Sequence, residues 1–243
     1  MTKCRTITML LLLVLTMSLL AACADKNAAE LENAVPSQSE VPVPTESRSI
    51  HTGQTNPRTG KVLVVYFTKV GNVAPTADAD AISSASLRAN DASTAGTTEV
   101  IAEMIHEQVG GDLVRIETVE PYPEDYEATV KQATEERTAG YKPPLQTKIE
   151  NIDDYDVVYV GHPIWGMSLP APIVSFLTEY EFSGKSIIPF CTHAGYGPGQ
   201  TVSAIKELVP GATVLDGFDI ERTELSNADE AVSAWLREIG MDM

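Results

Sequence analysis

Runs of apolar residues alternate with helix-like patterns through most of the chain, starting near residue 61. Residues 61–68 form a continuous apolar run, which is typical of a strand buried on both faces of a parallel sheet. Apolar residues over 97–109 instead recur every three or four positions, which predicts an amphipathic helix. The two patterns together predict five strands, at 61–68, 113–118, 157–160, 186–191 and 213–220, and five helices, at 97–109, 124–139, 171–180, 200–208 and 228–239.

This alternation of strands and helices predicts the fold class. It is typical of an α/β domain in which helices cover both faces of a parallel sheet, with right-handed crossover connections. Residues 61–243 are enough for one domain with a substantial hydrophobic core. The helix expected at 124–139 is polar, and we expect it to be an excursion on the surface.

The start of the chain is typical of a bacterial export signal. Two basic residues precede an apolar run over 9–20, which is too short to span a bilayer comfortably. The sequence Leu-Ala-Ala-Cys that ends at Cys23 matches a lipobox, in which the cysteine is acylated and becomes the new N-terminus. We therefore expect residues 1–22 to be a lipoprotein signal peptide. An ordinary secretory signal and a short anchor helix are the alternatives.

Residues 23–60 are expected to be a flexible linker. They are rich in Ala, Ser, Pro, Glu and Asn, and neither a helical nor a strand period persists among them. Two acyl chains on Cys23 would hold the protein stably at a membrane, whereas one chain alone gives marginal binding. The sequence thus predicts an exported domain, 61–243, that a tether holds off a bacterial membrane.

The net charge narrows the classes of partner. The chain has 34 acidic and 17 basic residues, a formal charge of −17, which moves to −19 when the signal peptide takes Lys3 and Arg5 with it. We expect so acidic a chain to bind neither nucleic acid nor, by electrostatics, anionic lipid. Membrane attachment is therefore expected through the lipid anchor alone. The charge favours a basic protein partner, or it only confers solubility. Cys191 is the single cysteine left in the domain, so no disulfide is expected within it.

The loop after the third expected strand suits a flat aromatic cofactor. Gly161-His162-Pro163-Ile164-Trp165-Gly166 follows that strand directly, and an indole in a Gly/Pro-rich loop offers a rigid surface for stacking. In parallel sheets, ligands bind beyond the carboxyl ends of the strands, where the loops after the first, third and fourth strands are expected to meet. These loops together predict a flavin site. The alternative is that Trp165 is a core residue.

Three motifs make the chain resemble the flavodoxin family over residues 61–240. They are Val-Val-Tyr-Phe-Thr ending at Thr68, Gly-His-Pro-Ile-Trp ending at Trp165, and Pro-Phe-Cys-Thr-His-Ala-Gly ending at Gly195. The chain is most similar to the branch with Pro-Ile-Trp and Thr-His-x-Gly loops. The resemblance implies a three-layer sandwich, a five-stranded parallel sheet in the order 2-1-3-4-5, and one FMN.

The phosphate-binding loop departs from the family pattern. Val73 stands where the family has a threonine, and residues 74–95 show no helical stripe. We therefore expect a split loop, because phosphate binding uses the amides at a helix N-terminus and the helix begins only near residue 97. Either Thr97 or Thr98 could simply cap the helix, and Gly71 and Asn72 could bind instead. In the split-loop hypothesis the phosphate lies against Thr68, Lys69, Gly96, Thr97 and Thr98, and residues 70–95 are an excursion.

Two further loops are expected to hold the flavin ring. Trp165 would stack on it, and backbone amides after the fourth strand would bind its carbonyl groups. His193 either donates a proton or only shapes its loop, and Cys191 is expected to be a small buried hydrophobe. The expected ring-binding residues are Pro163, Ile164, Trp165, Gly166, Cys191, Thr192, His193, Ala194, Gly195 and Tyr196.

These features leave three hypotheses for function. The first is an FMN-binding redox protein that carries electrons to or from a partner protein at a membrane. The second is an FMN-dependent reductase of quinones or other small acceptors that uses NAD(P)H, although no Gly-x-Gly-x-x-Gly fingerprint follows any strand. The third is a lipoprotein that lost the flavin and binds a ligand or partner, which the departure at Val73 favours.

Overall fold

The computed structural model describes residues 60–72 and 95–241 of the 243-residue chain. The expected signal peptide, Cys23, nearly all of the linker and most of the excursion 70–95 lie outside the described residues. Within the described ranges, no helix is both long and apolar enough to cross a bilayer.

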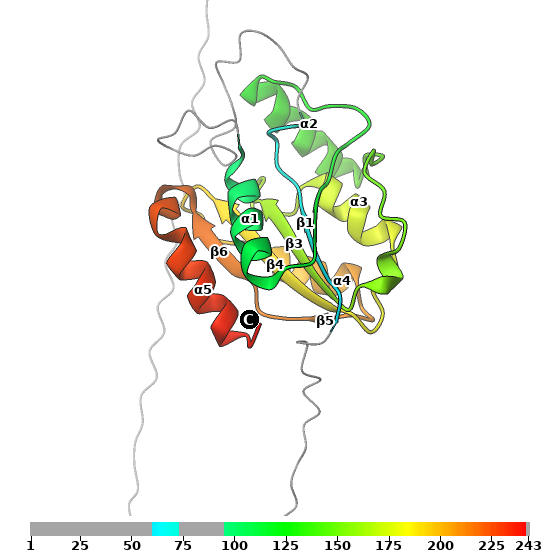
Figure 1. Cartoon of the computed structure of the whole chain (residues 1–243). Helices are drawn as coiled ribbons and strands as arrows, with labels where there is room; N and C mark the ends of the chain where they lie inside the picture. The colour runs from blue at the N-terminus through cyan, green and yellow to red at the C-terminus, as the bar shows by residue number, and fades with distance from the viewer. Residues whose placement is uncertain (1–59, 73–94, 242–243) are drawn as a thin grey trace, which may run out of the picture. The chain divides into compact units, whose positions relative to one another are not determined.

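A parallel sheet forms the centre of the domain (Figure 1). Its strands run in the order β2-β1-β3-β4-β5, and a further strand, β6, also pairs with β4. The expected α/β class and the strand order 2-1-3-4-5 are therefore confirmed. The strands are β1 (Val62–Tyr66), β2 (Asp112–Arg115), β3 (Val157–Pro163), β4 (Ser186–His193), β5 (Thr213–Val214) and β6 (Phe218–Glu221).

The fifth strand is interrupted, so the prediction of one continuous strand over 213–220 was wrong in detail. Both of its parts, β5 and β6, pair in parallel with β4. Val214 lies opposite Ile187 and Phe218 opposite Phe190, so four steps along the fifth strand face three along β4. One extra residue of this kind is a bulge. Pro189, which has no N–H to donate to a neighbouring strand, lies in β4 at the interruption.

Helices lie on both faces of the sheet and complete the three layers (Figure 1). Helices α1 and α5 cover one face and pack against each other, and α3 and α4 cover the other. All five expected helices are present, with ends within two residues of the expected ones. Their bounds are Thr97–Val109 (α1), Tyr126–Ala139 (α2), Ala171–Glu179 (α3), Thr201–Leu208 (α4) and Ala228–Glu238 (α5), with short 3-10 helices at Ile152–Asp154 and Arg222–Asn227.

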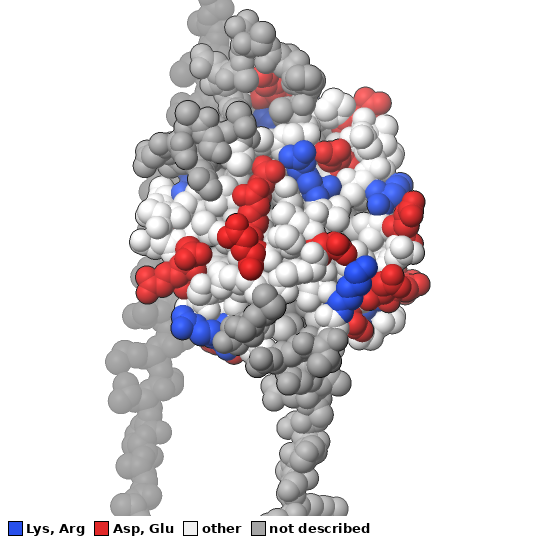
Figure 2. Space-filling model, viewed as in Figure 1, with Lys and Arg blue, Asp and Glu red and all other residues white. Residues whose placement is uncertain are grey.

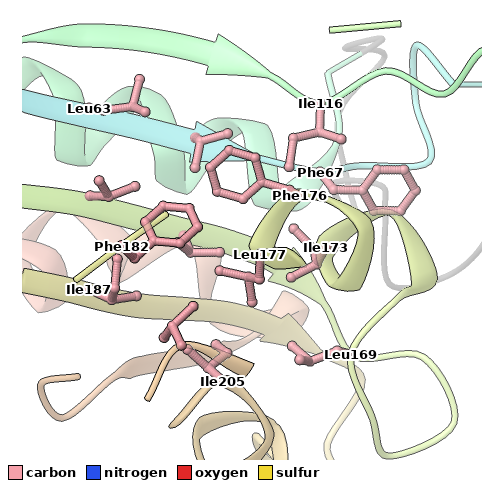
Figure 3. Close-up of a cluster of buried hydrophobic side chains, with 14 of the residues drawn as sticks. Leu63, Phe67, Ile116, Leu169, Ile173, Phe176, Leu177, Phe182, Ile187 and Ile205 are labelled. Atoms are coloured by element: carbon pink, nitrogen blue, oxygen red, sulfur yellow. The ribbon is translucent and has the colours of Figure 1, made fainter. Parts of the chain in front are cut away.

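The core is divided in two by the sheet. Successive residues of a strand point to opposite faces, so Leu63 and Val158 join one cluster while Val64 and Tyr159 join the other. Figure 3 shows the first cluster, in which apolar side chains of the strands meet those of α3 and α4. Because the central strands are covered on both faces, polar groups can gather only at the edges of the sheet.

Three buried polar side chains in or beside this core have an atom without a hydrogen-bond partner within the described residues: Tyr159, His162 and Trp235. His162, in β3, is fully buried, and its Nε2 has no hydrogen-bond partner within the described residues. Its Nδ1 lies 3.3 Å from the carbonyl oxygen of Pro163. Burial lowers the pKa of His162 from its ordinary value of 6.5 to about 4, so the imidazole is neutral in the folded protein at neutral pH.

The pKa of His162 predicts an acid-sensitive fold. Because the unfolded chain takes up the proton first, stability falls as the pH falls from 6.5 towards 4. Between pH 7 and pH 5 this group alone removes about 2 kcal/mol from the free energy of unfolding. Urea unfolding at both pH values measures the loss. H162L is expected to lose less stability than wild type over this range. Equal losses in wild type and H162L would contradict the prediction.

Candidate functional site

Three loops meet at the carboxyl edge of the sheet. Residues 67–72 follow β1, residues 164–170 follow β3, and residues 194–200 follow β4. These strands are parallel neighbours, so their carboxyl ends lie at the same edge (Figure 1). Helix α1 begins at this edge too, because Thr98 Oγ1 lies 2.8 Å from Thr192 Oγ1 near the end of β4. This is the arrangement that the sequence predicts for a ligand site.

Two buried threonine hydroxyls at this edge lack partners. Oγ1 of Thr68 and Oγ1 of Thr97 are inaccessible to solvent and form no hydrogen bond within the described parts of the chain. A buried hydroxyl without a partner costs free energy, so such groups usually have a ligand or an ordered water. A phosphate, with several strong acceptor oxygens, is a ligand that both hydroxyls could satisfy.

The start of α1 adds backbone donors. Thr97 and Thr98 lie in its first turn, where amides have no partner within the helix. Helix N-termini favour anions for this reason. The amide of Gly96 is not available, however, because it donates to Oε2 of Glu99 at 3.1 Å. Of the five residues expected around the phosphate, Thr68, Thr97 and Thr98 thus offer donors at the edge of the sheet, and Gly96 sets the start of the helix.

The other residues of the first loop hold the loop in place. The amide of Asn72 donates to the carbonyls of Thr68 and Ile116, both at 2.9 Å, and its Oδ1 accepts from the N–H of Thr118 at 3.0 Å. The side chain of Asn72 is therefore fully engaged and joins the loops after β1 and β2. The ammonium of Lys69 donates to the carbonyl of Glu124 at 2.7 Å. Burial lowers the pKa of Lys69, while the nearby carboxylates of Asp125 and Glu124 oppose that shift.

Trp165 lies in the loop after β3, as expected, but most of its surface is buried. Its ring is 8% exposed and belongs to the core cluster of α3 and α4. It meets the rings of Phe67 and Tyr122 edge to face, with centroids 5.3 and 5.2 Å away. Trp165 also lines the cavity described below, so its stacking on a flavin ring stays a prediction.

His193, at the end of β4, has both ring nitrogens engaged. Its Nδ1 accepts the N–H of Gly195 at 3.1 Å, so Nε2 carries the proton and donates to Asp219 at 3.0 Å. In this arrangement His193 has no N–H left to offer a ligand, and Gly195 has no amide left for a flavin carbonyl. The structure therefore favours the hypothesis that His193 shapes its loop. Cys191, two residues earlier in β4, is buried, which raises the pKa of its thiol.

A cavity of about 350 Å³ opens beside these loops. Its size is at the lower end of the range for small-molecule sites. The loops contribute Ile164, Trp165, Gly166 and Met167 after β3 and His193, Ala194 and Tyr196 after β4, and the remaining lining residues are Tyr126, Thr129, Val130, Ala133, Thr134 and Arg137.

Helix α2 is largely exposed, as expected, and it also forms the other wall of the cavity. The lining residues of α2 recur every three or four positions, which places them on one side of the helix. Two buried contacts fix this helix: Tyr122 donates to Oε2 of Glu136 at 2.7 Å, and Lys69 reaches the carbonyl before the N-cap. The N-cap, Asp125, accepts the N–H of Ala128 at 2.7 Å. The sequence predicts this helix, but it does not show that one side of the helix faces a cavity.

The expected ring-binding residues divide into two groups. Ile164, Trp165, Gly166, His193, Ala194 and Tyr196 line the cavity. Pro163, Cys191, Thr192 and Gly195 do not line it. Thr192 instead meets Thr98, so it connects the ring side of the site with the start of α1.

Comparisons with known proteins agree with this architecture. A family model described as flavodoxin matches residues 86–239, more than half of the chain. No curated protein matches the sequence.

Solved structures resemble the chain as well. A protein from Bacteroides eggerthii DSM 20697, solved as a candidate flavoprotein, is 27% identical, with a TM-score of 0.55 over 74% of this chain and 97% of its own. A second candidate flavoprotein, from Bacteroides uniformis ATCC 8492, is 24% identical, with a TM-score of 0.57 over 73% and 98%. A flavoprotein from Lactobacillus acidophilus NCFM, solved in complex with FMN, is 22% identical, with a TM-score of 0.48 over 69% and 97%. The family match, on a sheet of the order β2-β1-β3-β4-β5, shows that the chain belongs to the flavodoxin family.

Proposed function

We propose that the chain is an FMN-binding redox protein, exported and anchored at a bacterial membrane, that carries electrons between partners. One observation carries the FMN assignment: Thr68 and Thr97, at the edge where α1 begins, are buried hydroxyls without hydrogen-bond partners among the described residues. A buried hydroxyl without a hydrogen bond destabilises the fold, and a phosphate would accept a hydrogen bond from each of these two threonines. Membership of the flavodoxin family supports the same cofactor.

Different residues of the chain would bind different parts of the cofactor. Thr68, Thr97 and Thr98 would hold the phosphate by hydroxyls and amides, without a lysine or arginine. Trp165 and the loop after β4 would border the ring, and Tyr196 is exposed at its edge. When bound, FMN supplies one- and two-electron chemistry; the protein supplies binding, orientation and tuning.

A second candidate function, a reductase of small acceptors such as quinones, is favoured by the cavity. An electron carrier needs only an exposed ring edge, whereas a recess walled by α2 provides room for a substrate. On the face shown in Figure 2, acidic and basic side chains are interspersed, without one large acidic patch for a basic partner. The overall reaction would transfer a hydride from NAD(P)H and a proton from water to the quinone, which becomes the hydroquinone.

Replacing Thr97 by valine separates ligand binding from folding. T97V keeps the shape of the side chain and removes a hydroxyl without a partner, so the FMN-free protein should unfold at the same or a higher urea concentration than wild type. Loss of a hydrogen bond to a charged phosphate should weaken FMN binding about tenfold to a hundredfold. Quenching of FMN fluorescence on titration measures the affinity.

A matched control is Thr178, in α3, whose exposed hydroxyl donates to the carbonyl of Val174 at 2.8 Å. T178V should bind FMN as wild type does. Equal affinity of T97V and wild type would contradict the proposed phosphate site. If wild type itself binds no FMN at micromolar concentration, the flavin-free hypothesis replaces the redox one.

Steady-state turnover distinguishes the carrier from the reductase. With NADH or NADPH as donor and a soluble quinone as acceptor, a reductase should reach a kcat of at least about 1 s⁻¹, within the usual range for enzymes. A carrier should hold FMN that can be reduced chemically. Its turnover should be no faster than that of free FMN at the same concentration.

The proposed acylation of Cys23 predicts that a variant without this cysteine changes its location. C23S removes the only atom that could carry the thioether-linked lipid, so the variant should leave the membrane fraction while wild type stays in it after a high-salt wash. Fractionation followed by immunoblotting measures the distribution. Equal amounts of wild type and C23S in the washed membranes would contradict acylation at this residue.

A further inference from the structure

The cavity differs in charge from the chain around it. Acidic residues outnumber basic ones by 34 to 17. Yet no Asp or Glu is among the described residues that line the cavity, and Arg137 is the only one of them with a permanent charge. An acidic protein thus presents a cation, and no carboxylate, among the described residues of this cavity.

The guanidinium of Arg137 lies across the loop after β3. A Cβ atom on Gly166 would stand 2.6 Å from Nη1 of Arg137, so the glycine leaves the space that the guanidinium uses. Gly166 also has a φ of +58°, which a glycine adopts without strain. The exposed side chain, which extends from the last turn of α2, therefore lies at the cavity beside Gly166.

Arg137 has no ion pair within the described residues. Lys131, on the same helix, pairs with Glu135 at 4.0 Å, and Glu136, next to Arg137, accepts from Tyr122 and Gln132. The neighbouring charges of α2 are thus engaged with one another. A guanidinium left beside an apolar recess can offer two parallel N–H groups to a carboxylate.

Flat apolar side chains surround the cavity. Trp165 forms part of its wall, and so do four exposed large hydrophobic residues: Tyr126, Val130, Met167 and Tyr196. Tyr196 is 74% exposed and Met167 48%. Such residues are unremarkable singly, but here they share one recess, and planar side chains pack best against planar ligands.

We propose that this cavity binds a flat conjugated molecule that carries a carboxylate or similar anionic group, and that Arg137 binds that group. The inference rests on the proposed function, since the bound molecule would be the small acceptor of the FMN-dependent reaction. The α2 wall of the cavity, where Tyr126 and Val130 are exposed, would hold the ring system against the flavin ring that the loops after β3 and β4 border. The guanidinium would select the anion over a neutral molecule of the same shape. Arg137 is a specificity-determining residue in this proposal, separate from the threonines that hold the phosphate.

A pair of redox-inert probes tests the proposal without turnover. The probes are 2-naphthoate and 2-naphthamide, which share a ring system and differ in charge. Isothermal titration of the flavin-loaded protein should give a Kd about tenfold lower for the naphthoate than for the naphthamide. Only the naphthoate can form a charge-assisted pair with Arg137. R137Q should remove this preference, and R137K, which keeps the charge but not the fork, should keep part of it.

K131Q is the matched control, because it removes one positive charge from the same helix outside the cavity. It should keep the full preference for naphthoate. Equal Kd values for the two probes in wild type, or an unchanged preference in R137Q, would overturn the proposal. Loss of FMN from R137Q, seen in its absorption spectrum, would also overturn it by assigning Arg137 to the flavin. If wild type holds no FMN, the proposed function fails, while the probe preference still shows whether the cavity selects an anion.

Discussion

The burial of β1, β3 and β4 on both faces is the constraint on which the rest of the structure depends. Parallel strands in this position must be covered by helices, and their side chains join one core or the other. Polar groups that have a function are left with the carboxyl edge, where all three strands end in loops. The unpartnered hydroxyls of Thr68 and Thr97, and the contact between Thr98 and Thr192, all lie at this edge.

A second layer of buried polar contacts fixes what stands around that edge. Asn72 ties the loop after β1 to the loop after β2, and Lys69 extends from the first loop to the start of α2. Tyr122 adds a hydrogen bond to Glu136 near the C-terminal end of α2 and an edge-on contact with Trp165. The loop expected to bind the phosphate, the wall of the cavity and the tryptophan are therefore parts of one connected unit.

Much of the fold follows from local patterns in the sequence. Apolar runs located the strands, with β5 and β6 expected as one, and helical patterns located the five α-helices but not the two short 3-10 helices. Both signals depend on residues near in the chain. The interruption of the fifth strand does not follow from such patterns, since it depends on its register against Pro189 in β4. Trp165 was correctly expected in a loop, but its burial depends on Phe67 and Tyr122, which are distant in sequence. The role of α2 depends likewise on what its stripe faces.

The central claim is that neutral hydroxyls and helix amides, rather than cationic side chains, hold the phosphate of FMN. Phosphorus NMR of FMN with the purified protein tests it most directly, because a phosphate monoester in water titrates with a second pKa near 6. The account predicts a separate bound resonance that does not shift between about pH 5 and pH 8, since buried donors keep the phosphate a dianion. A single resonance that titrates like that of free FMN would contradict it.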